Sequence, residues 1–341
     1  MASDVSTVVV TGGCGFIGSH FVRFQLQRYP NARVINIDKL TYAADVNRLR
    51  DVKRDPRYRF VKADICDRKK VLKAIRGADY IVNFAAETHV DNSIKNPQPF
   101  IKTNILGTFN LLECARLVPG LKKYVQVSTD EVYGPILEGH FPEDAPIKPS
   151  NPYSAAKASA DALAFSYHVT YRVPVAITRT TNNYGSGQFP EKVVPVFVKR
   201  ALENKPLPVY GDGLHKRRWI HVEDHCNGID MVMRKGVAGN IYHIAGDSEI
   251  TNIDLARSIL QCLGKPESLI QFIEDHDIRP GHDRRYSLDD SKIRKELGWT
   301  SSISFSEGLA RAVASYVVEP KPHKANGGIA KKKTRLAALR S

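Results

Sequence analysis

The stretch TVVVTGGCGFIGSH, residues 7–20, places Gly12, Gly15 and Gly18 where an apolar run ends and a helical pattern begins. Val8–Val10 predict a buried β-strand, and we expect a helix from about Phe16. Glycines at such a junction let backbone N–H groups approach a pyrophosphate at the positive N-terminus of the helix. The spacing predicts a dinucleotide-binding turn. Because a purely structural turn could carry the same glycines, the residues that follow decide between the two.

Asp38 lies twenty residues after Gly18, at the end of a second apolar run. A carboxylate at this place accepts hydrogen bonds from a ribose 2′-hydroxyl and repels a 2′-phosphate. The sequence therefore favours NAD over NADP as the cofactor, although the neighbouring Lys39 argues mildly for NADP.

The remaining cofactor contacts are expected at further strand ends and in the motifs below. Asp64 and Ile65 could flank the adenine, and Phe84 to His89 end the fourth predicted strand. The predicted cofactor residues are Gly12, Gly15, Phe16, Ile17, Gly18, Asp38, Lys39, Leu40, Thr41, Asp64, Ile65, Phe84, Ala85, Ala86, Thr103, Tyr153 and Lys157.

Strand-like runs alternate with helical patterns over the first 180 residues, which predicts an α/β fold with a Rossmann-type, doubly wound parallel sheet. We expect residues 1–180 to form the NAD-binding domain and 181–318, rich in proline, to form a smaller substrate-binding lobe. A strand near 240–246 should rejoin the main sheet, so the lobe is interleaved and no clean boundary is expected. Residues 319–341 are expected to be a basic, disordered tail.

The composition, 42% hydrophobic and 25% charged, is that of a soluble protein, and the start of the sequence has no secretory pattern. We therefore expect a cytoplasmic protein. The net charge of +14 would suggest nucleic acid as a partner, but half of it lies in residues 321–341, so we expect neither nucleic acid nor membrane as a partner. The five cysteines form no C-x-x-C pair, and no metal site is expected.

Tyr153 and Lys157, in NPYSAAKAS, are four residues apart and share one face of a predicted helix. A tyrosine has a pKa near ~10, and a neighbouring ammonium and the nicotinamide charge favour its phenolate. The pair thus suits removal of a proton from an alcohol while a hydride leaves. Alone, this spacing is common on helices, but after the dinucleotide motif the functional interpretation is favoured.

Two adjacent carboxylates, Asp130 and Glu131, follow the predicted strand Tyr124–Val127 in STDEVYG. Hydride transfer from an alcohol needs one base, so the pair indicates a second reaction. Together these motifs resemble the extended short-chain dehydrogenase/reductase family. STDEVYG, NNYGSGQFPEK, YGDGLHKRRWIHVEDH and RPGHDRRYSLDD are similar to the dTDP-glucose 4,6-dehydratases within it, over about residues 6–318.

The resemblance implies conversion of dTDP-glucose to a 4-keto-6-deoxy sugar and water, with Tyr153 and Lys157 acting at C4. It implies Asp130 as the acid, Glu131 as the base, and Thr129 as a hydrogen-bond partner of the sugar near C4. The substrate residues it implies are Thr88, Thr129, Asn182, Lys192, Val193, Pro208, Val209, Tyr210, Arg217, Asn252, Arg279 and His282. It also implies Asn183 as a cofactor contact. Arg217 and Arg279 suit a diphosphate.

The alternatives are a UDP- or CDP-glucose dehydratase, a nucleotide-sugar epimerase, which the acid pair disfavours, and a non-catalytic binding protein. The sequence departs from the commonest family pattern at Thr88, at Ser186–Gly187 and at Arg218, and the last two bear on base specificity. The resemblance also implies a homodimer formed through helices, including residues 100–117 and 154–171.

Overall fold

The structure, a computed structural model, describes residues 6–274 and 283–318. Its centre is a seven-stranded, fully parallel sheet in the order β10-β6-β5-β4-β1-β2-β3. The strands are β1 (Thr7–Thr11), β2 (Arg33–Asp38), β3 (Tyr58–Lys62), β4 (Tyr80–Asn83), β5 (Lys123–Thr129), β6 (Val175–Thr180) and β10 (Ile241–Ile244). The predicted doubly wound sheet is confirmed, and β10 lies at its edge, paired with β6.

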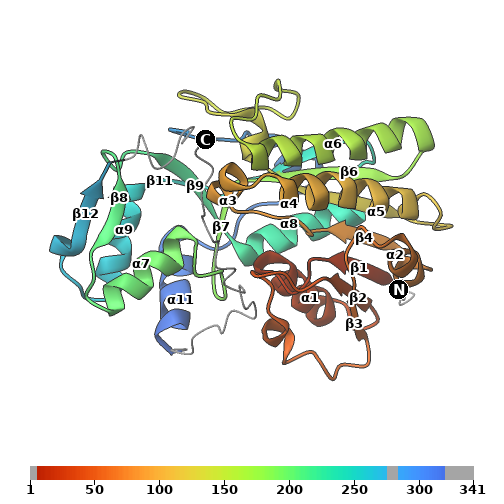
Figure 1. Ribbon diagram of the computed structural model, residues 1–341, viewed down its shortest axis with the longest axis horizontal. Helices are drawn as coiled ribbons and strands as arrows, with labels where there is room; N and C mark the ends of the chain where they lie inside the picture. Colours follow the sequence, from red (N-terminus) through yellow and green to blue (C-terminus); the bar gives the residue numbers. More distant parts are fainter. Residues whose placement is uncertain (1–5, 275–282, 319–341) are drawn as a thin grey trace, which may run out of the picture.

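Helices cover both faces of this sheet (Figure 1). Alternation along β1 shows why, because Val8 and Val10 enter one core while Val9 enters the other. The first core takes in α1 (Phe16–Arg28), α8 (Val222–Lys235) and α10 (Ser291–Leu297). The second core takes in α2 (Arg68–Ile75), α5 (Thr108–Ala115) and α6 (Pro152–Tyr171).

The helical stretch predicted around residues 100–117 is a composite. It consists of α4 (Gln98–Phe100), a π-helical segment at Ile101–Gly107 and α5, and α3 (Val90–Lys95) precedes it. The π-helical segment contains Thr103, whose side chain is buried and accepts a hydrogen bond from Lys39 Nζ at 2.8 Å. Local widening of a helix of this kind often occurs at functional sites.

A second, smaller body lies at one end of the molecule (Figure 1). Its two small sheets are β11-β9-β7 and β12-β8, formed by β7 (Asn182–Tyr184), β8 (Leu207–Tyr210), β9 (Lys216–His221), β11 (Ser248–Thr251) and β12 (Ile270–Ile273). Its helices are α7 (Val193–Leu202), α9 (Asn252–Cys262) and α11 (Phe305–Val318), and they share an apolar core with β8 and β9.

Residues 181–318 contribute to both bodies. Residues 222–244 supply α8 and β10 to the main sheet, and Ile293 and Trp299 are buried in the core beneath α1. The smaller body is formed by the parts of 181–318 that carry β7, α7, β8 and β9 before α8, and β11, α9, β12 and α11 after β10. Because the chain passes back and forth between the two, their relative placement is fixed by several covalent connections.

The part of the chain that the structure describes contains no helix long and apolar enough to cross a membrane. The cysteines are unpaired, and Cys14, Cys114 and Cys226 are buried, whereas Cys262 is exposed.

Candidate active site

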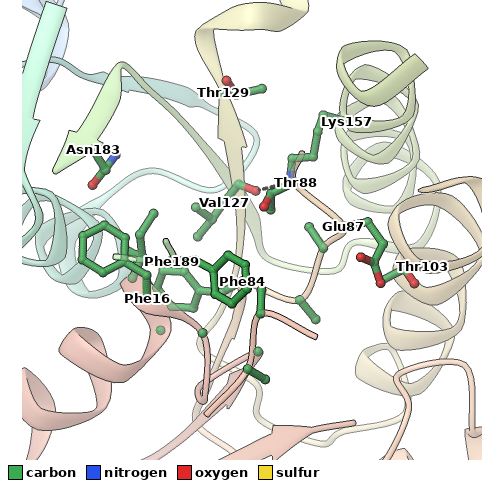
Figure 2. A pocket seen from close by; sticks show the side chains of 18 of the residues that line it. Phe16, Phe84, Glu87, Thr88, Thr103, Val127, Thr129, Lys157, Asn183 and Phe189 are labelled. Carbon is green, nitrogen blue, oxygen red and sulfur yellow. Dashed lines mark hydrogen bonds between the residues drawn. The ribbon is translucent and has the colours of Figure 1, made fainter. Parts of the chain in front are cut away.

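A cavity of about 310 Å³ opens at the carboxyl ends of β1, β2, β4, β5 and β6. This is where β1 pairs with both β2 and β4, the point of a doubly wound sheet at which ligands bind. Figure 2 shows the side chains that line it: Phe16 and Phe84 on one side, Lys157 and Thr103 from helices on another, and Asn183 and Phe189 from the chain after β6.

The glycine turn at the end of β1 leaves no room for side chains. Gly12 has a φ of 69°, and a Cβ there would lie 2.8 Å from the backbone nitrogen of Ala85. A Cβ at Gly18 would overlap the Gly12 carbonyl oxygen. The helix α1 begins directly afterwards, and its N-cap, Gly15, supplies no side-chain cap to the first turn. This cradle fits a pyrophosphate bound by backbone N–H groups.

Asp38 ends β2 and is 7% exposed, and its carboxylate accepts hydrogen bonds from the backbone nitrogens of Cys14 (3.0 Å) and Leu40 (2.7 Å). Burial raises the pKa of the Asp38 carboxyl, and the two N–H groups oppose the rise. Leu40 has a left-handed φ of 61°, which brings its N–H back toward this carboxylate.

The positive charge of Lys39, which would favour NADP, is compensated by two neighbouring carboxylates. Its Nζ lies 3.8 Å from Asp64 and 3.7 Å from Glu87, besides its hydrogen bond to Thr103. An ammonium held between two carboxylates has less attraction left for a 2′-phosphate. The pocket around Asp38 therefore fits NAD.

The acid pair occupies a 3₁₀ turn, Asp130–Tyr133, that directly follows β5. Thr129 caps this turn: its Oγ1 accepts from the Glu131 nitrogen (3.3 Å) and donates to Asp130 Oδ1 (3.1 Å). Burial first, and then the charge of Glu131, raise the pKa of Asp130 to about 7. Burial also raises the pKa of Glu131, opposed by Lys192 and Arg217. The turn thus pairs a carboxyl that can be neutral near pH 7 with a second carboxyl.

Tyr153 lies in the first turn of α6, which begins with a capping box between Asn151 and Ser154. Burial, followed by the charges of Glu131 and Asp130, raises the pKa of the Tyr153 phenol far above its usual value. This shift favours the neutral phenol, whereas the sequence predicts that the phenolate is favoured. Desolvation and the two nearby carboxyls both disfavour the negative charge of the phenolate.

Lys157 follows one helical turn later and is 6% exposed. Its Nζ donates a hydrogen bond to the Val127 carbonyl at 2.6 Å, drawn as a dashed line in Figure 2. Burial lowers the pKa of Lys157 to about 8, and Asp161 opposes this. The predicted pair is thus brought into one cavity with Thr129, Asp130 and Glu131.

Most predicted cofactor residues line the cavity, and Leu40 and Asp64 are the two that stand outside its wall. Among the predicted substrate residues, Thr88, Thr129, Asn182 and Lys192 line it. The others among the described residues lie in the smaller body and do not reach this wall: Val193, Pro208, Val209, Tyr210, Arg217 and Asn252. Arg279 and His282 fall outside the described residues.

Strand β8 divides its predicted substrate residues between two faces. Val209 is 1% exposed and packs in the core of the smaller body, whereas Pro208 and Tyr210 alternate with it on the more accessible face. That these three residues pack near the base stays a prediction, and at Val209 the contact would be made by the backbone, because the side chain is buried in the core. Strand periodicity gives this alternation once the strand is known.

Arg217 is held against the backbone around residue 283. It donates to the Asp283 carbonyl at 2.8 Å, and its guanidinium lies 4.7 Å from the centre of the Tyr286 ring. Its neighbour Arg218 points to the other side of β9 and donates to the carbonyls of Gly246 (2.8 Å) and Leu288 (2.5 Å). The unusual arginine at 218 thus secures two backbone segments.

A loop between β7 and α7 supplies three cavity residues that belong to the NNYGSGQFPEK motif but were not among the predicted site residues: Gln188, Phe189 and Glu191. Phe189 packs edge-on against Tyr42 with ring centres 5.4 Å apart, and the Tyr42 hydroxyl donates to Glu191 at 3.1 Å. These contacts join the smaller body to the loop after β2. We call residues 186–192 the strap.

Further hydrogen bonds hold the strap to the main body. Arg48 Nε donates to the Gly187 carbonyl at 3.1 Å, and the Ser186 carbonyl lies 2.9 Å from His20 Nε2. Lys192 Nζ donates to the Thr88 carbonyl at 3.2 Å. The unusual Ser186–Gly187 pair therefore contacts the cofactor side of the molecule. The position of this loop after a strand end indicates that it lies near the site. The residues that it contacts, such as Arg48 and His20, are not evident from the sequence.

Comparisons with known proteins agree with this site. The sequence profile of a family described as GDP-mannose 4,6 dehydratase matches residues 9–312. A dTDP-glucose 4,6-dehydratase from Streptomyces niveus is 46% identical and is matched over 91% of this chain and 92% of its own. The low-salt glycan biosynthesis protein Agl12 of Haloferax volcanii is 47% identical over 91% of this chain and 98% of its own.

The fold is shared with a solved relative at the same level of identity. The dTDP-glucose 4,6-dehydratase DesIV from Streptomyces venezuelae, solved with NAD and TYD bound, superimposes with a TM-score of 0.88. It is 48% identical, and the match covers 92% of this chain and 97% of that one.

The parallel sheet, the glycine turn and the Tyr153/Lys157 pair define a nucleotide-dependent enzyme of the extended short-chain dehydrogenase/reductase class. Within that class, the chain belongs to the dTDP-glucose 4,6-dehydratase family.

Proposed function

We propose that the protein is an NAD-dependent dTDP-glucose 4,6-dehydratase, a hydro-lyase that converts dTDP-glucose to dTDP-4-keto-6-deoxyglucose and water. The observation that carries the proposal is the turn after β5. There a carboxyl with a pKa of about 7 adjoins a second carboxyl, in the same cavity as Tyr153 and Lys157. Oxidation of an alcohol uses only the latter two residues, and elimination of water uses an acid and a base in addition.

The cofactor would be held by the glycine turn and Asp38, with Phe16, Ile65, Phe84 and Thr103 along the cavity wall. NAD, when bound, accepts a hydride from C4 of the glucose and later supplies one to C6. Tyr153 takes the proton of the C4 hydroxyl. The Lys157 ammonium favours the phenolate that this requires and works against the effect of burial.

The ketone formed at C4 makes the C5 hydrogen acidic. Glu131 removes that proton, and Asp130, neutral near pH 7, gives its proton to the C6 hydroxyl, which departs as water. Glu131 is then protonated and can return a proton to C5. Thr129 contributes by fixing the turn, since its hydroxyl contacts both carboxyl residues, and it lies on the cavity wall where it can bind the sugar.

The test is to incubate the purified protein with dTDP-glucose and follow the alkali-induced absorbance of a 4-keto-6-deoxy sugar. We expect this product with dTDP-glucose, and less with UDP- or CDP-glucose in parallel reactions. Preference for UDP- or CDP-glucose would reassign the base. Formation of dTDP-galactose in place of the keto sugar would identify an epimerase and refute the proposal.

We also propose that the protein is a homodimer formed through α5, α6 and the π-helical segment. These elements lie side by side on the second face of the sheet and expose large apolar side chains: Ile101, Leu106, Phe109, Phe165 and Val169, each 45–54% exposed. We call this set the helical patch. Apolar patches of this kind are typical of subunit interfaces.

A further inference from the structure

A buried ion pair lies next to the catalytic helix and has no part in the reaction described above. Asp161, on α6, accepts a hydrogen bond from Arg179 Nε at 3.0 Å, and the two side chains are only 2% and 3% exposed. An arginine stays protonated in proteins, so its burial requires a negative partner. Asp161 is therefore ionised, even though burial alone raises the pKa of its carboxyl.

The Asp161–Arg179 ion pair lies close to Lys157, as the helix spacing and the strand register show. Asp161 follows Lys157 by four residues on α6, as Lys157 follows Tyr153, so the three share one helix face. Arg179 is the register partner of Ser128, the residue after Val127, whose carbonyl holds the Lys157 ammonium. Helix spacing and sheet register thus place the carboxylate beside the lysine.

Tyr133 holds Arg179 in place through a hydrogen bond and a ring contact. Arg179 Nη1 donates to the Tyr133 hydroxyl at 2.5 Å, and that hydroxyl lies 2.7 Å from His243 Nε2. The Tyr133 ring also lies 4.7 Å from the guanidinium carbon. With Arg179 held on this side, Asp161 has a defined position toward α6.

Lys157 needs such a partner because its surroundings disfavour its charge. Desolvation opposes an ammonium that is 6% exposed, and its hydrogen bond to Val127 is made to a neutral carbonyl. Of the titratable and charged groups near it, Tyr153, Asp130 and Glu131 line the same cavity, and Asp161 and Arg179 form the buried ion pair. Of these, Asp161 is the one whose charge acts appreciably on Lys157.

We propose that Asp161, fixed by Arg179, is a positioning residue that keeps the Lys157 ammonium charged and in place for its action on Tyr153. The inference rests on the proposed function, because it concerns the oxidation step at C4.

The test is the pH dependence of C4 oxidation in Asp161→Asn, which keeps the shape of the side chain and removes its charge. Without the carboxylate, Lys157 loses its proton at lower pH. The alkaline limb of the pH–rate profile should therefore shift to lower pH by about one to two units. The acid limb should also move down, because Asp161 raises the pKa of Tyr153. The ratio of wild-type to variant rate should therefore grow as the pH rises, to about tenfold or more at pH 8.

Asp230→Asn is the matched control. Asp230 is likewise 5% exposed on its side chain and paired with an arginine, Arg234, at 3.0 Å, but it lies on α8, in contact with α1. Asp230→Asn should lower the free energy of unfolding without shifting the acid or the alkaline limb of the pH–rate profile. A purely structural role of Asp161 would lower the rate equally at every pH, and an Asp161→Asn profile that only drops in height would overturn the proposal.

Two further variants cover the case in which Asp161→Asn fails to fold. Asp161→Asn with Arg179→Gln removes both charges of the pair, which proteins tolerate better than an unpaired buried arginine, and the downward shift should persist. Asp161→Glu keeps the charge and should leave the limbs in place. A wild-type enzyme that forms no keto sugar would refute the proposed function, whereas an active wild type with unshifted variants would refute only this inference.

Discussion

Asp130 and Glu131 illustrate at the scale of the residue how a reaction can depend on burial. Two ionised carboxyls that are adjacent and buried repel each other, so one is held neutral near pH 7. A carboxyl that can donate a proton and one that can accept a proton then lie side by side in one turn. Asp130 holds the proton because it is only 4% exposed in the turn after β5, more buried than Glu131, although the hydrogen bond that it accepts from the Thr129 hydroxyl opposes the rise in its pKa.

Asp130 should make the folded protein less stable as the pH rises. Its pKa is about 7 when folded and near ~4 when unfolded, so between these values only the unfolded state releases the proton. The folded state is favoured at low pH and loses this contribution up to about pH 7. Asp130→Asn, which mimics the neutral form, should gain on the order of 2–4 kcal/mol over wild type at pH 8 and little at pH 4.

Urea unfolding of both proteins at pH 4 and pH 8, with equal nucleotide content, checks this expectation. Asp254→Asn, at an exposed carboxylate on α9, serves as the control and should show no such pH-dependent gain. A wild type as stable as Asp130→Asn at pH 8 would mean that Asp130 ionises freely in the folded protein.

Tyr153→Phe removes the acceptor of the C4 proton and should lower the rate of the first step by ~10²- to 10⁴-fold, the usual effect of losing a positioned base. Reduced cofactor should hardly form, because the hydride leaves C4 only as the C4 hydroxyl loses its proton, and the later steps then have no substrate. Stopped-flow absorbance with dTDP-glucose measures it. Retention of rapid reduction in Tyr153→Phe would assign the base role to another group.

At the scale of the element, local patterns gave correct strands and helix starts. Val8–Val10, Asp38 at a strand end and Phe16 at a helix start are where the sequence predicts them. Two features escaped: the π-helical segment at Ile101–Gly107 and the edge-on contact between Tyr42 and Phe189. Hydrophobic periodicity does not distinguish π from α turns over seven residues, and a contact across 147 positions depends on the assembled fold.

The strap is expected to retain the cofactor, because it lines the cavity and is bonded to the loop after β2. Phe189→Ala removes an aromatic contact worth ~0.5–1.5 kcal/mol, so bound nucleotide should dissociate about three- to tenfold faster. Release of NAD after rapid dilution into a nucleotide-scavenging mixture measures it. Val237→Ala, at an exposed side chain away from the cavity, is the control. Equal release rates would show that the strap does not limit escape.

At the scale of the whole molecule, the sequence predicted the parallel sheet and the return of a strand near residue 240, but not the path between them. The helix α8 and Trp299 pack into the core beneath α1, and no local pattern distinguishes a helix of the main body from one of the smaller body. Motifs alone single out Asp130, Glu131, Tyr153 and Lys157, which the structure brings to one cavity. The place of the Asp161–Arg179 pair beside Lys157, in contrast, depends on the register of β5 with β6.

The proposed homodimer predicts that a charge in the helical patch separates the subunits. Leu106→Glu places a carboxylate on a side chain that is 54% exposed within the patch, and burying it in an interface would be costly. Light scattering should give about twice the chain mass for wild type and a lower mass for the variant. Leu137→Glu, at a side chain 73% exposed outside the patch, should remain like wild type. A monomeric wild type would contradict the proposed assembly.

In the proposed mechanism, one cavity performs oxidation with Tyr153 and Lys157 and elimination with Asp130 and Glu131. The most direct test is the double variant Asp130→Asn/Glu131→Gln mixed with dTDP-glucose. Oxidation at C4 should still occur while water loss stalls, so the absorbance of reduced nicotinamide near ~340 nm should accumulate. Solvent deuterium should enter C5 slowly or not at all. Production of the 4-keto-6-deoxy sugar at the wild-type rate would contradict the account.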